Sequence, residues 1–338
     1  MNSENRLVPR LIAIAAFLVI ADIAAAQVPS PALLVVNKDE NAMAIVDPIA
    51  KKVLGSVRVG DGPHEVAASS DGKLGFVSNY GPGNATVPGS SISVIDLATK
   101  KELRKFEIGQ GAKPHGLVFA GGKLYFTAEG FDMIGTYDPA SNKMDWMLGT
   151  GQDRTHVLAI SPDRNRIFTS NINSDSINIL ERVGDPPDWT STVVKVGKGP
   201  EGIDVSPDGK EVWTSHTADG AVSVIDVATK KVTHTLNLNM VRANRLKLTP
   251  DGKYVLISDA RGGKLLVLDA ATKKEIKRID IGRGPTGIIM VPGGKQAIIA
   301  ISGDNSLAYF DLKTLEVTER FSPGKNPDGL AWIAAAGD

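Results

Sequence analysis

Three of the five histidines in this chain occupy matching places in a repeated pattern. His64, His115 and His156 each follow a glycine-containing loop and precede a short apolar stretch. Imidazole nitrogens bind copper, zinc, iron and nickel, and a carboxylate can complete such a site. The matching places later in the chain hold four more polar residues, Glu201, Asn244, Thr286 and Asp328. Two interpretations follow: the histidines hold a transition metal, or all seven side chains line a channel and face water.

Basic residues accompany these seven places, which we call the ring positions. Arg154 and Arg242 each precede a ring position by two residues, and Arg245 replaces a glycine found after other ring positions. A pair of guanidinium groups can clamp a carboxylate or a phosphate, although loop arginines are usually solvated. His216 ends a predicted strand, and we expect it near Glu201 as an acid or base; the alternative is a surface-loop histidine.

The elements that must position these residues follow from the repeat itself. The ring positions 201, 244, 286 and 328 lie 43, 42 and 42 residues apart. In the clearest copy, short apolar or alternating segments at 202–205, 211–215, 221–226 and 232–238 predict four strands, and a Pro-Asp-Gly sequence at 207–209 predicts a turn. No segment has sustained helical periodicity. Four strands per unit at this period predict an all-β seven-bladed β-propeller of antiparallel strands.

The two ends of the chain predict how the ring closes. The repeat begins in the middle of a unit, with apolar residues 32–36, and it ends after one further strand at 329–333. Pairing of this C-terminal strand with the N-terminal hairpin would complete a blade and cover its free edges. We therefore expect one domain over residues 27–338.

A family resemblance rests on the second strand of each unit. These strands read Phe-Val-Ser-Asn at 76–79, Phe-Thr-Ser-Asn at 168–171 and Val-Trp-Thr-Ser at 212–215. Together with the Ser-Pro-Asp-Gly turns and the Val-Ile-Asp hairpins, they resemble the YVTN family of seven-bladed β-propellers. The resemblance covers nearly all of the chain after residue 30. It implies the fold and a secreted or surface location, and it leaves the function open.

Residues 1–26 are expected to form a signal peptide. Arg6 and Arg10 precede an apolar core at 11–20, and three alanines precede Gln27. The apolar run is too short for a stable membrane span, with an uncleaved anchor as the alternative. We therefore expect a periplasmic or secreted protein, and a monomer.

Composition excludes several kinds of chemistry. The chain has no cysteine, which excludes covalent c-type haem, cysteine-ligated iron–sulfur clusters and thiolate catalysis. The 38 basic and 38 acidic residues balance, so no broad nucleic-acid surface is expected. No nucleotide-binding motif is present. A transition metal is the one cofactor that the sequence suggests.

The two channel-mouth loops of each blade are where a propeller would hold a ligand. The predicted ligand-binding residues there are His64, His115, His156, Glu201, Asn244, Asp328, His216, Arg154, Arg242 and Arg245, with His64, His115 and His156 as the metal ligands and no catalytic residue assigned. The sequence favours a scaffold that binds a small molecule or another exported protein. The alternatives are a metalloprotein, a lactonase-like hydrolase, and an accessory to a periplasmic quinoprotein redox system.

Overall fold

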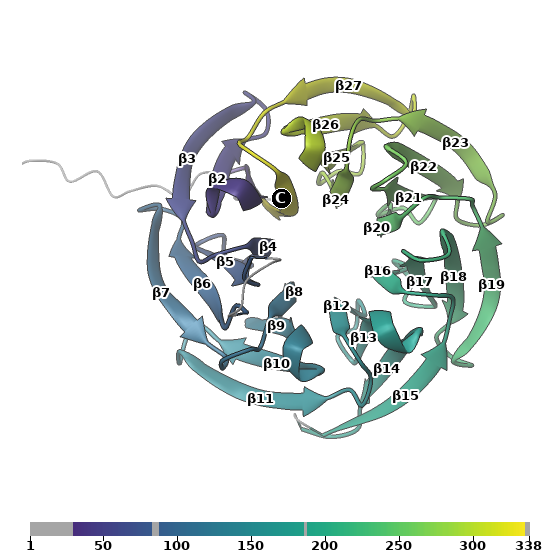
Figure 1. The fold of residues 1–338 in the computed structure, drawn as a ribbon, viewed down its shortest axis with the longest axis horizontal. Helices are drawn as coiled ribbons and strands as arrows, with labels where there is room; N and C mark the ends of the chain where they lie inside the picture. The colour runs from purple at the N-terminus through teal and green to yellow at the C-terminus, as the bar shows by residue number, and fades with distance from the viewer. Residues whose placement is uncertain (1–29, 83–87, 186–187, 335–338) are drawn as a thin grey trace, which may run out of the picture.

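A computed structural model describes residues 30–82, 88–185 and 188–334. Seven four-stranded antiparallel sheets radiate from one axis (Figure 1), so the predicted seven-bladed propeller is confirmed. The expected signal peptide at 1–26 lies outside the described residues. Within the described ranges, no helix has the length and apolar character needed to cross a membrane.

We number the blades by their ring positions, so that blade 1 carries His64 and blade 7 carries Asp328. From the axis outwards, blades 1 to 3 consist of β4 (Pro63–Ala68), β5 (Leu74–Asn79), β6 (Ser91–Asp96) and β7 (Lys101–Glu107); β8 (Pro114–Ala120), β9 (Lys123–Ala128), β10 (Met133–Asp138) and β11 (Lys143–Gly149); and β12 (Thr155–Ile160), β13 (Arg166–Asn171), β14 (Ser176–Arg182) and β15 (Trp189–Lys195).

The remaining blades repeat this order. Blades 4 to 7 consist of β16 (Pro200–Val205), β17 (Glu211–His216), β18 (Ala221–Asp226) and β19 (Lys231–Asn237); β20 (Ala243–Leu248), β21 (Tyr254–Asp259), β22 (Lys264–Asp269) and β23 (Glu275–Asp280); β24 (Pro285–Met290), β25 (Gln296–Ile301), β26 (Ser306–Asp311) and β27 (Glu316–Phe321); and β28 (Pro327–Ile333), β1 (Ala32–Asn37), β2 (Ala42–Asp47) and β3 (Lys52–Arg58).

Short 3₁₀ helices follow the second strand in four of the blades. They are η1 (Lys38–Glu40), η2 (Glu129–Phe131), η3 (Ile172–Ser174) and η4 (Ser302–Asp304). Each ends at a residue in the left-handed conformation, for example Asn41 with φ 47° and Asp132 with φ 56°. These single turns lead the chain into the third strand.

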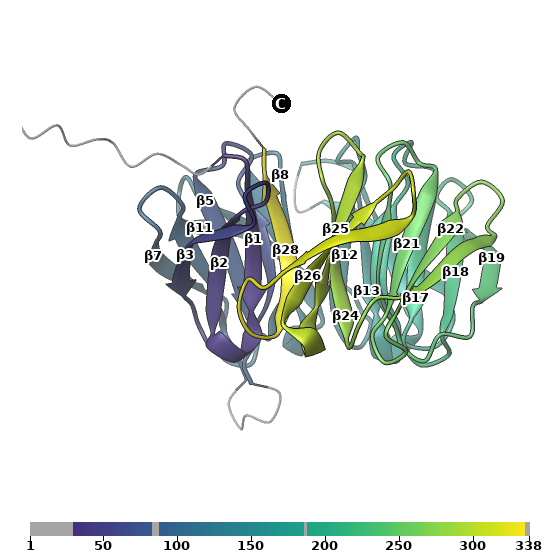
Figure 2. The ribbon, with the colours of Figure 1, turned by 90° about the horizontal axis from the view of Figure 1, so that it is seen from above.

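Blade 7 is closed by strands from both ends of the chain, as predicted. β28 pairs with β1 in antiparallel register, with Leu33 opposite Trp332 and Val35 opposite Leu330. Figure 2 shows the C-terminal strand beside the N-terminal strand. The pairing covers an edge of β1 that would otherwise be open to intermolecular pairing.

The inner strands begin earlier than the apolar pattern predicts. β16 starts at Pro200 and not at residue 202, and β28 starts at Pro327 and not at residue 329. The reason is a bulge: Pro200 pairs with His216, and regular pairing resumes only at Ile203 opposite Thr214. The ring position is therefore the second residue of an inner strand, beside a bulge, and not a loop residue. Bulges of this kind redirect side chains.

The Ser-Pro-Asp-Gly sequences form the predicted turns at the other end of the blades. In blade 4, the Ser206 hydroxyl lies 2.7 Å from Asp208 Oδ1, and the Gly209 N–H donates to the Ser206 carbonyl at 2.8 Å. Gly209 has φ 72°, a conformation that glycine adopts without strain. The motif is thus explained by turn chemistry alone.

Candidate functional site

A hydroxyl from each neighbouring blade fixes several ring residues. The second-strand residue Thr127 donates to the carbonyl of His156 at 2.7 Å, Ser170 donates to that of Glu201 at 2.7 Å, and Ser215 donates to that of Asn244 at 2.6 Å. These hydroxyls belong to the Thr-Ser-Asn-like motif of the second strand. The motif therefore holds the inner strand of the next blade in place.

A second set of seven residues, the inner-loop positions, directly follows the second strands. It comprises Lys38, Tyr80, Glu129, Ile172, Thr217, Ala260 and Ser302. Every member except Ser302 lines the same cavity as the ring residues. The mouth is therefore built from two residues per blade, one on the inner strand and one at the end of the second.

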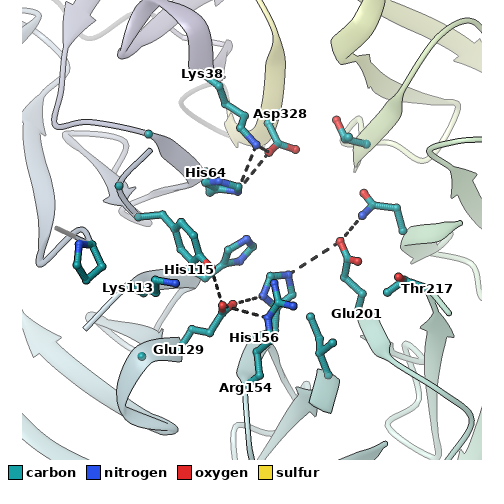
Figure 3. A pocket seen from close by; sticks show the side chains of 18 of the residues that line it. Lys38, His64, Lys113, His115, Glu129, Arg154, His156, Glu201, Thr217 and Asp328 are labelled. Atoms are coloured by element: carbon teal, nitrogen blue, oxygen red, sulfur yellow. Dashed lines mark hydrogen bonds and ion pairs between the residues drawn. The ribbon is translucent and has the colours of Figure 1, made fainter. Parts of the chain in front are cut away.

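The cavity at this mouth has a volume of about 1130 Å³, and its walls are mainly polar and charged (Figure 3). All seven ring residues line it, and so do Arg154, Arg242 and Arg245. Gly81, Pro82 and Pro88, from the long loop after β5, also line it. The structure thus brings nine of the ten predicted ligand-binding residues to one cavity.

The ring is more buried than a water-filled channel would leave it. His115, His156, Glu201, Asn244 and Asp328 each expose 6% or less of their surface. The expectation that the ring side chains simply face channel water is therefore wrong for these residues. They are buried because they pack against and bond to one another across the axis.

The three histidine rings pack in a row at a tilt of 49° and 35° to one another, and we call this row the histidine stack. The ring centroids of His64 and His115 are 4.9 Å apart, and those of His115 and His156 are 3.8 Å apart. Burial lowers the pKa of His115 well below its usual value, and the neighbouring histidines add to this effect. In the described ranges no group of three or more His, Asp or Glu is arranged to hold a metal ion. Metal binding by this trio stays a prediction.

The Glu129 carboxylate holds the imidazole of His156, at one end of the histidine stack, in place. Glu129 Oε2 lies 2.5 Å from His156 Nδ1, and Glu129 Oε1 accepts hydrogen bonds from Tyr80 at 2.5 Å and from Arg154 Nε at 3.1 Å. Burial alone would raise the pKa of Glu129, but His156, Tyr80 and Arg154 lower it to about 2. The ionised carboxylate accepts all three bonds, so His156 carries its proton on Nδ1.

The opposite end of the stack meets a lysine and an aspartate. Lys38 Nζ lies 3.2 Å from Asp328 Oδ2 and 3.5 Å from His64 Nδ1. Burial lowers the pKa of His64 to about 3, with the charge of Lys38 as the next cause. Burial would raise the pKa of Asp328, but Lys38, His64 and Arg245 lower it. At neutral pH, His64 is therefore neutral beside an ion pair.

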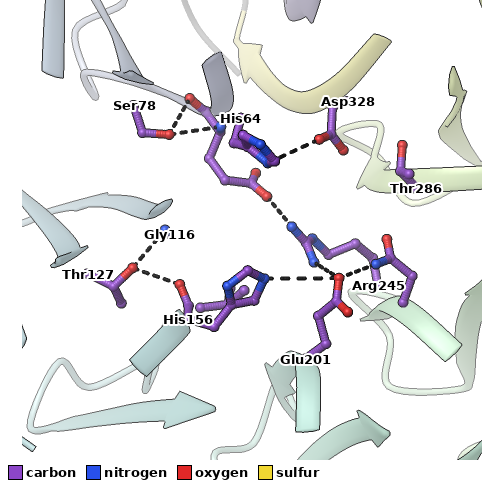
Figure 4. A network of polar contacts seen from close by, with 12 residues as sticks. His64, Ser78, Gly116, Thr127, His156, Glu201, Arg245, Thr286 and Asp328 are labelled. Carbon is purple, nitrogen blue, oxygen red and sulfur yellow. Dashed lines mark hydrogen bonds and ion pairs between the residues drawn. The ribbon is translucent and has the colours of Figure 1, made fainter. Parts of the chain in front are cut away.

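A third network crosses the axis (Figure 4). Arg245 Nη2 lies 2.6 Å from Glu65 Oε1, and Arg245 Nη1 lies 3.2 Å from Glu201 Oε1. Glu201 also accepts hydrogen bonds from Asn244 and from Arg242 Nη2. His156 Nε2 is 4.0 Å from Glu201 Oε1, which joins this network to the histidine stack.

The structure contradicts the placement of His216 at the mouth. Its residue exposure is 0%, it is not part of the cavity wall, and its Nδ1 lies 3.2 Å from Asp219 Oδ1. His216 is the last residue of β17, whereas the next residue, Thr217, reaches the cavity. Because side chains alternate along a strand, an error of one residue turns the predicted acid or base away from the mouth. It is not a surface-loop histidine either.

Four functional candidates were not predicted from the sequence: Lys38, Glu65, Tyr80 and Glu129. Lys38, Tyr80 and Glu129 directly follow a second strand. His216 was predicted because it is the last residue of such a strand, so the same search moved by one residue finds the other three. Glu65 stands where Gly116 and Gly202 stand in other blades, which is the same kind of departure that singled out Arg245.

The propeller has similar solved structures at low sequence identity. These include hydrazine synthase of Kuenenia stuttgartiensis (18% identity, TM-score 0.74, 88% of this chain and 99% of that chain) and a periplasmic gluconolactonase of Pseudomonas aeruginosa (17%, 0.72, 90% and 99%). A third is a proposed 6-phosphogluconolactonase of Bacteroides uniformis (16%, 0.75, 90% and 99%). At such identities the likeness shows the fold alone. No curated protein matches the sequence.

One family is shown by the sequence itself. The model of the YNCE-like beta-propeller family matches residues 119–295, which is just over half of the chain. The matched region runs from the inner strand of blade 2 to the turn after the inner strand of blade 6, and it includes the ring residues His156, Glu201, Asn244 and Thr286. The chain therefore belongs to the YNCE-like beta-propeller family.

Proposed function

We propose that this protein binds a small, hydroxylated polar molecule in the cavity at the channel mouth. The observation that carries the proposal is the cavity itself, about 1130 Å³, lined by the seven polar ring residues and by six of the inner-loop positions. Its volume lies just above the usual range for ligand sites, roughly 300–1,000 Å³. Glu201, Asn244, Thr286 and Asp328 offer carboxylate, amide and hydroxyl groups, which suit the hydroxyls of a ligand.

A steric test leaves these polar groups in place. Ala260 lines the cavity, and Ala228 lies exposed in the turn between β18 and β19. We expect Ala260→Trp to fill part of the cavity and to abolish binding of polyols and sugars measured by calorimetry. Ala228→Trp adds the same indole elsewhere and should bind as the unmodified protein does. Equal binding by both variants would place the ligand outside the mouth.

The His156–Glu129 pair favours a second candidate, hydrolysis of a cyclic ester. In the tautomer whose proton lies on Nδ1 against Glu129, the His156 imidazole has a lone pair on Nε2. His156 would take a proton from water as the water oxygen attacks the lactone carbonyl. The ring C–O bond would then break, and the same proton would pass to the leaving alkoxide. The two similar structures that bear lactonase names support this candidate.

The hydrolase candidate has its own test. Hydrolysis of a δ-lactone above the spontaneous rate should fall at least a hundredfold in His156→Gln, since general-base catalysis contributes about 10²–10⁴-fold. Glu129→Gln should also slow it, because a neutral amide accepts the Nδ1–H bond more weakly and can also turn its N–H₂ group towards Nδ1, which favours the other tautomer. His234 lies exposed on β19, and His234→Gln is the control. If the unmodified protein does not raise the rate of hydrolysis above the spontaneous rate, the hydrolase candidate fails and only the binding role remains.

We also propose that the protein is exported, like the secreted members of the YVTN family that it resembles. The support is the charged start at Arg6 and Arg10 and the apolar run that follows. N-terminal sequencing of protein recovered from the periplasm should begin at or next to Gln27. Recovery of residues 11–20 on the purified protein would indicate an anchor instead.

A further inference from the structure

One sector of the mouth carries three basic residues at the same register position. Lys113, Arg154 and Arg242 each stand two residues before a ring position, on blades 2, 3 and 5. All three line the cavity. Each blade contributes this position beside its inner strand, so the three residues face the cavity from the arc of blades 2 to 5. We call them the rim cations.

At two of these positions the backbone has a positive φ, and three other blades have a glycine there. Lys113 has φ 47° and Arg154 has φ 61°. The same position in blades 1, 4 and 6 holds Gly62, Gly199 and Gly284, with φ between 55° and 67°. Side chains other than glycine are disfavoured in this conformation, and such outliers cluster at ligand sites. Lysine and arginine adopt the same conformation in turns elsewhere in the chain, for example Lys230 with φ 56° and Arg164 with φ 61°, so the backbone permits these long basic side chains but does not by itself explain them.

Contacts place the rim cations on both sides of His156. Arg154 Nε contacts Glu129, which bonds His156 Nδ1, and Arg242 Nη2 contacts Glu201, which lies near His156 Nε2. Lys113 Nζ lies 5.3 Å from the centre of the Tyr80 ring, which also bonds Glu129. The cations thus surround one end of the histidine stack.

Each arginine keeps donors that the protein does not use. Arg154 contacts Glu129 through Nε, and within the described ranges its terminal nitrogens have no partner. Arg242 uses Nη2, while its buried Nε has no hydrogen-bond partner among the described residues. Buried donors are normally satisfied, so the unpaired Nε of Arg242 is unusual. The terminal nitrogens of Arg154 belong to a side chain that is 42% exposed, and they are open to an acceptor that enters the cavity.

Acidic residues also line the rim, but they are engaged in the loops. Asp132 Oδ1 accepts the Arg154 backbone N–H at 2.6 Å, and Asp153 Oδ1 accepts Asn173 Nδ2 at 3.3 Å. Asp39 Oδ1 accepts Asn326 Nδ2 at 2.8 Å. These carboxylates stabilise the loop conformations, whereas the rim cations extend over the cavity.

We infer that the rim cations form a subsite for an oxyanion, so that the ligand of the mouth carries a carboxylate or a phosphate monoester. This inference rests on the proposed binding function and names the ligand class. The guanidinium donors of Arg154 and Arg242 would bind the anionic oxygens, and Lys113 would add a point charge. The hydroxylated part of the ligand would then reach towards Glu201 and Asn244.

The test uses three ligands with the same six-carbon polyol chain: glucitol, gluconate and glucitol 6-phosphate. The full protein should bind at least one of the two anions ten or more times more tightly than neutral glucitol, by calorimetry at low salt. A preference for gluconate alone or for the phosphate alone identifies which oxyanion the subsite takes. Raising the salt concentration should reduce the difference.

Glycine variants test whether the rim cations determine ligand preference without being needed for the stability of the fold. Lys113→Gly relieves the left-handed backbone and breaks no ion pair of the described residues, so its Tm should be unchanged or higher while the preference for the anion falls. Arg154→Gly should lose the preference more completely. Lys198→Ala removes an exposed charge next to the mouth, outside the cavity wall, and should retain it.

The outcomes distinguish the two proposals. Equal affinity for glucitol and both anions would overturn the oxyanion subsite and leave the binding function intact. Binding of none of the three by the unmodified protein would overturn both. An anion preference that survives in Lys113→Gly and Arg154→Gly alike would place the anionic group elsewhere and overturn the assignment to the rim cations.

Discussion

Arg245 on blade 5 and Glu65 on blade 1 form an ion pair across the axis of the propeller, with Nη2 and Oε1 2.6 Å apart. The two residues are 180 positions apart in the sequence. Both stand where a glycine follows the ring position in other blades, so the two departures from the repeat meet each other. Burial raises the pKa of Glu65, and the charge of Arg245 opposes that rise.

We expect Arg245→Ala to destabilise the protein strongly, by about 3–5 kcal/mol, because it leaves the Glu65 carboxylate without its ion-pair partner and removes one of the donors to the buried Glu201. The free energy of unfolding from urea titrations would measure this. In a double-mutant cycle, Glu65→Ala together with Arg245→Ala should cost less than the sum of the single changes. Additive costs would show that the pair does not couple the two blades.

We expect the stability of the protein to fall as the pH drops from 6.5 towards 3. The folded-state pKa of His64 is lowered to about 3 and that of His115 is also lowered, so in this window the unfolded chain binds more protons than the folded one. Each such histidine contributes a slope of up to ~1.4 kcal/mol per pH unit. Glu65 acts in the opposite direction, because its folded-state pKa is raised.

Urea titrations between pH 7.5 and 4.5 would measure this slope. Replacing His64 and His115 by glutamine should flatten it, since an amide does not titrate. His234→Gln changes an exposed histidine and should leave the slope unchanged. A slope that persists in the double variant would have to arise outside the stack.

We expect Gly202→Ala to destabilise the protein by about 1–3 kcal/mol through overpacking. A Cβ atom on Gly202 would lie 2.4 Å from the carbonyl oxygen of Asn244 on the next blade. Gly149 is the matched control, because a Cβ there has no neighbour within 4 Å. Thermal unfolding of the two variants would compare them, and equal Tm values would show that the inner strands can move apart.

We expect removal of residues 329–338 to leave the protein insoluble or without a cooperative unfolding transition. The deletion removes most of β28 and exposes the edge of β1, including Val35 and Leu33. Removal of residues 335–338 alone leaves β28 whole and is the control. A Tm for the longer deletion within a few degrees of the full chain would show that the pairing of β1 with β28 contributes little.

The fold was predictable because the same local signals recur along the chain. Asp-Gly turns such as Asp208-Gly209 mark the first hairpin in blades 1, 4 and 5, and the ring positions follow from simple alignment of the copies. The site was predictable only as a set of positions. The stacking of His115 on His156, and the choice of Glu129 as partner, depend on distances between blades that no single copy contains. His216 shows the limit most clearly, since one residue separates a buried side chain from a cavity wall.

The closure of blade 7 also limits when the protein can finish folding. β1 and β28 are separated by nearly the whole chain, and closing so long a loop is slow because its entropic cost precedes any contact. A chain synthesised from its N-terminus has an unpaired edge at β1 until β28 is available. During that interval Leu33, Leu34 and Val35 offer a template for pairing with other chains. The pairing of β1 with β28 stabilises the complete propeller, and the same edge of β1 is where an incomplete propeller is most exposed to aggregation.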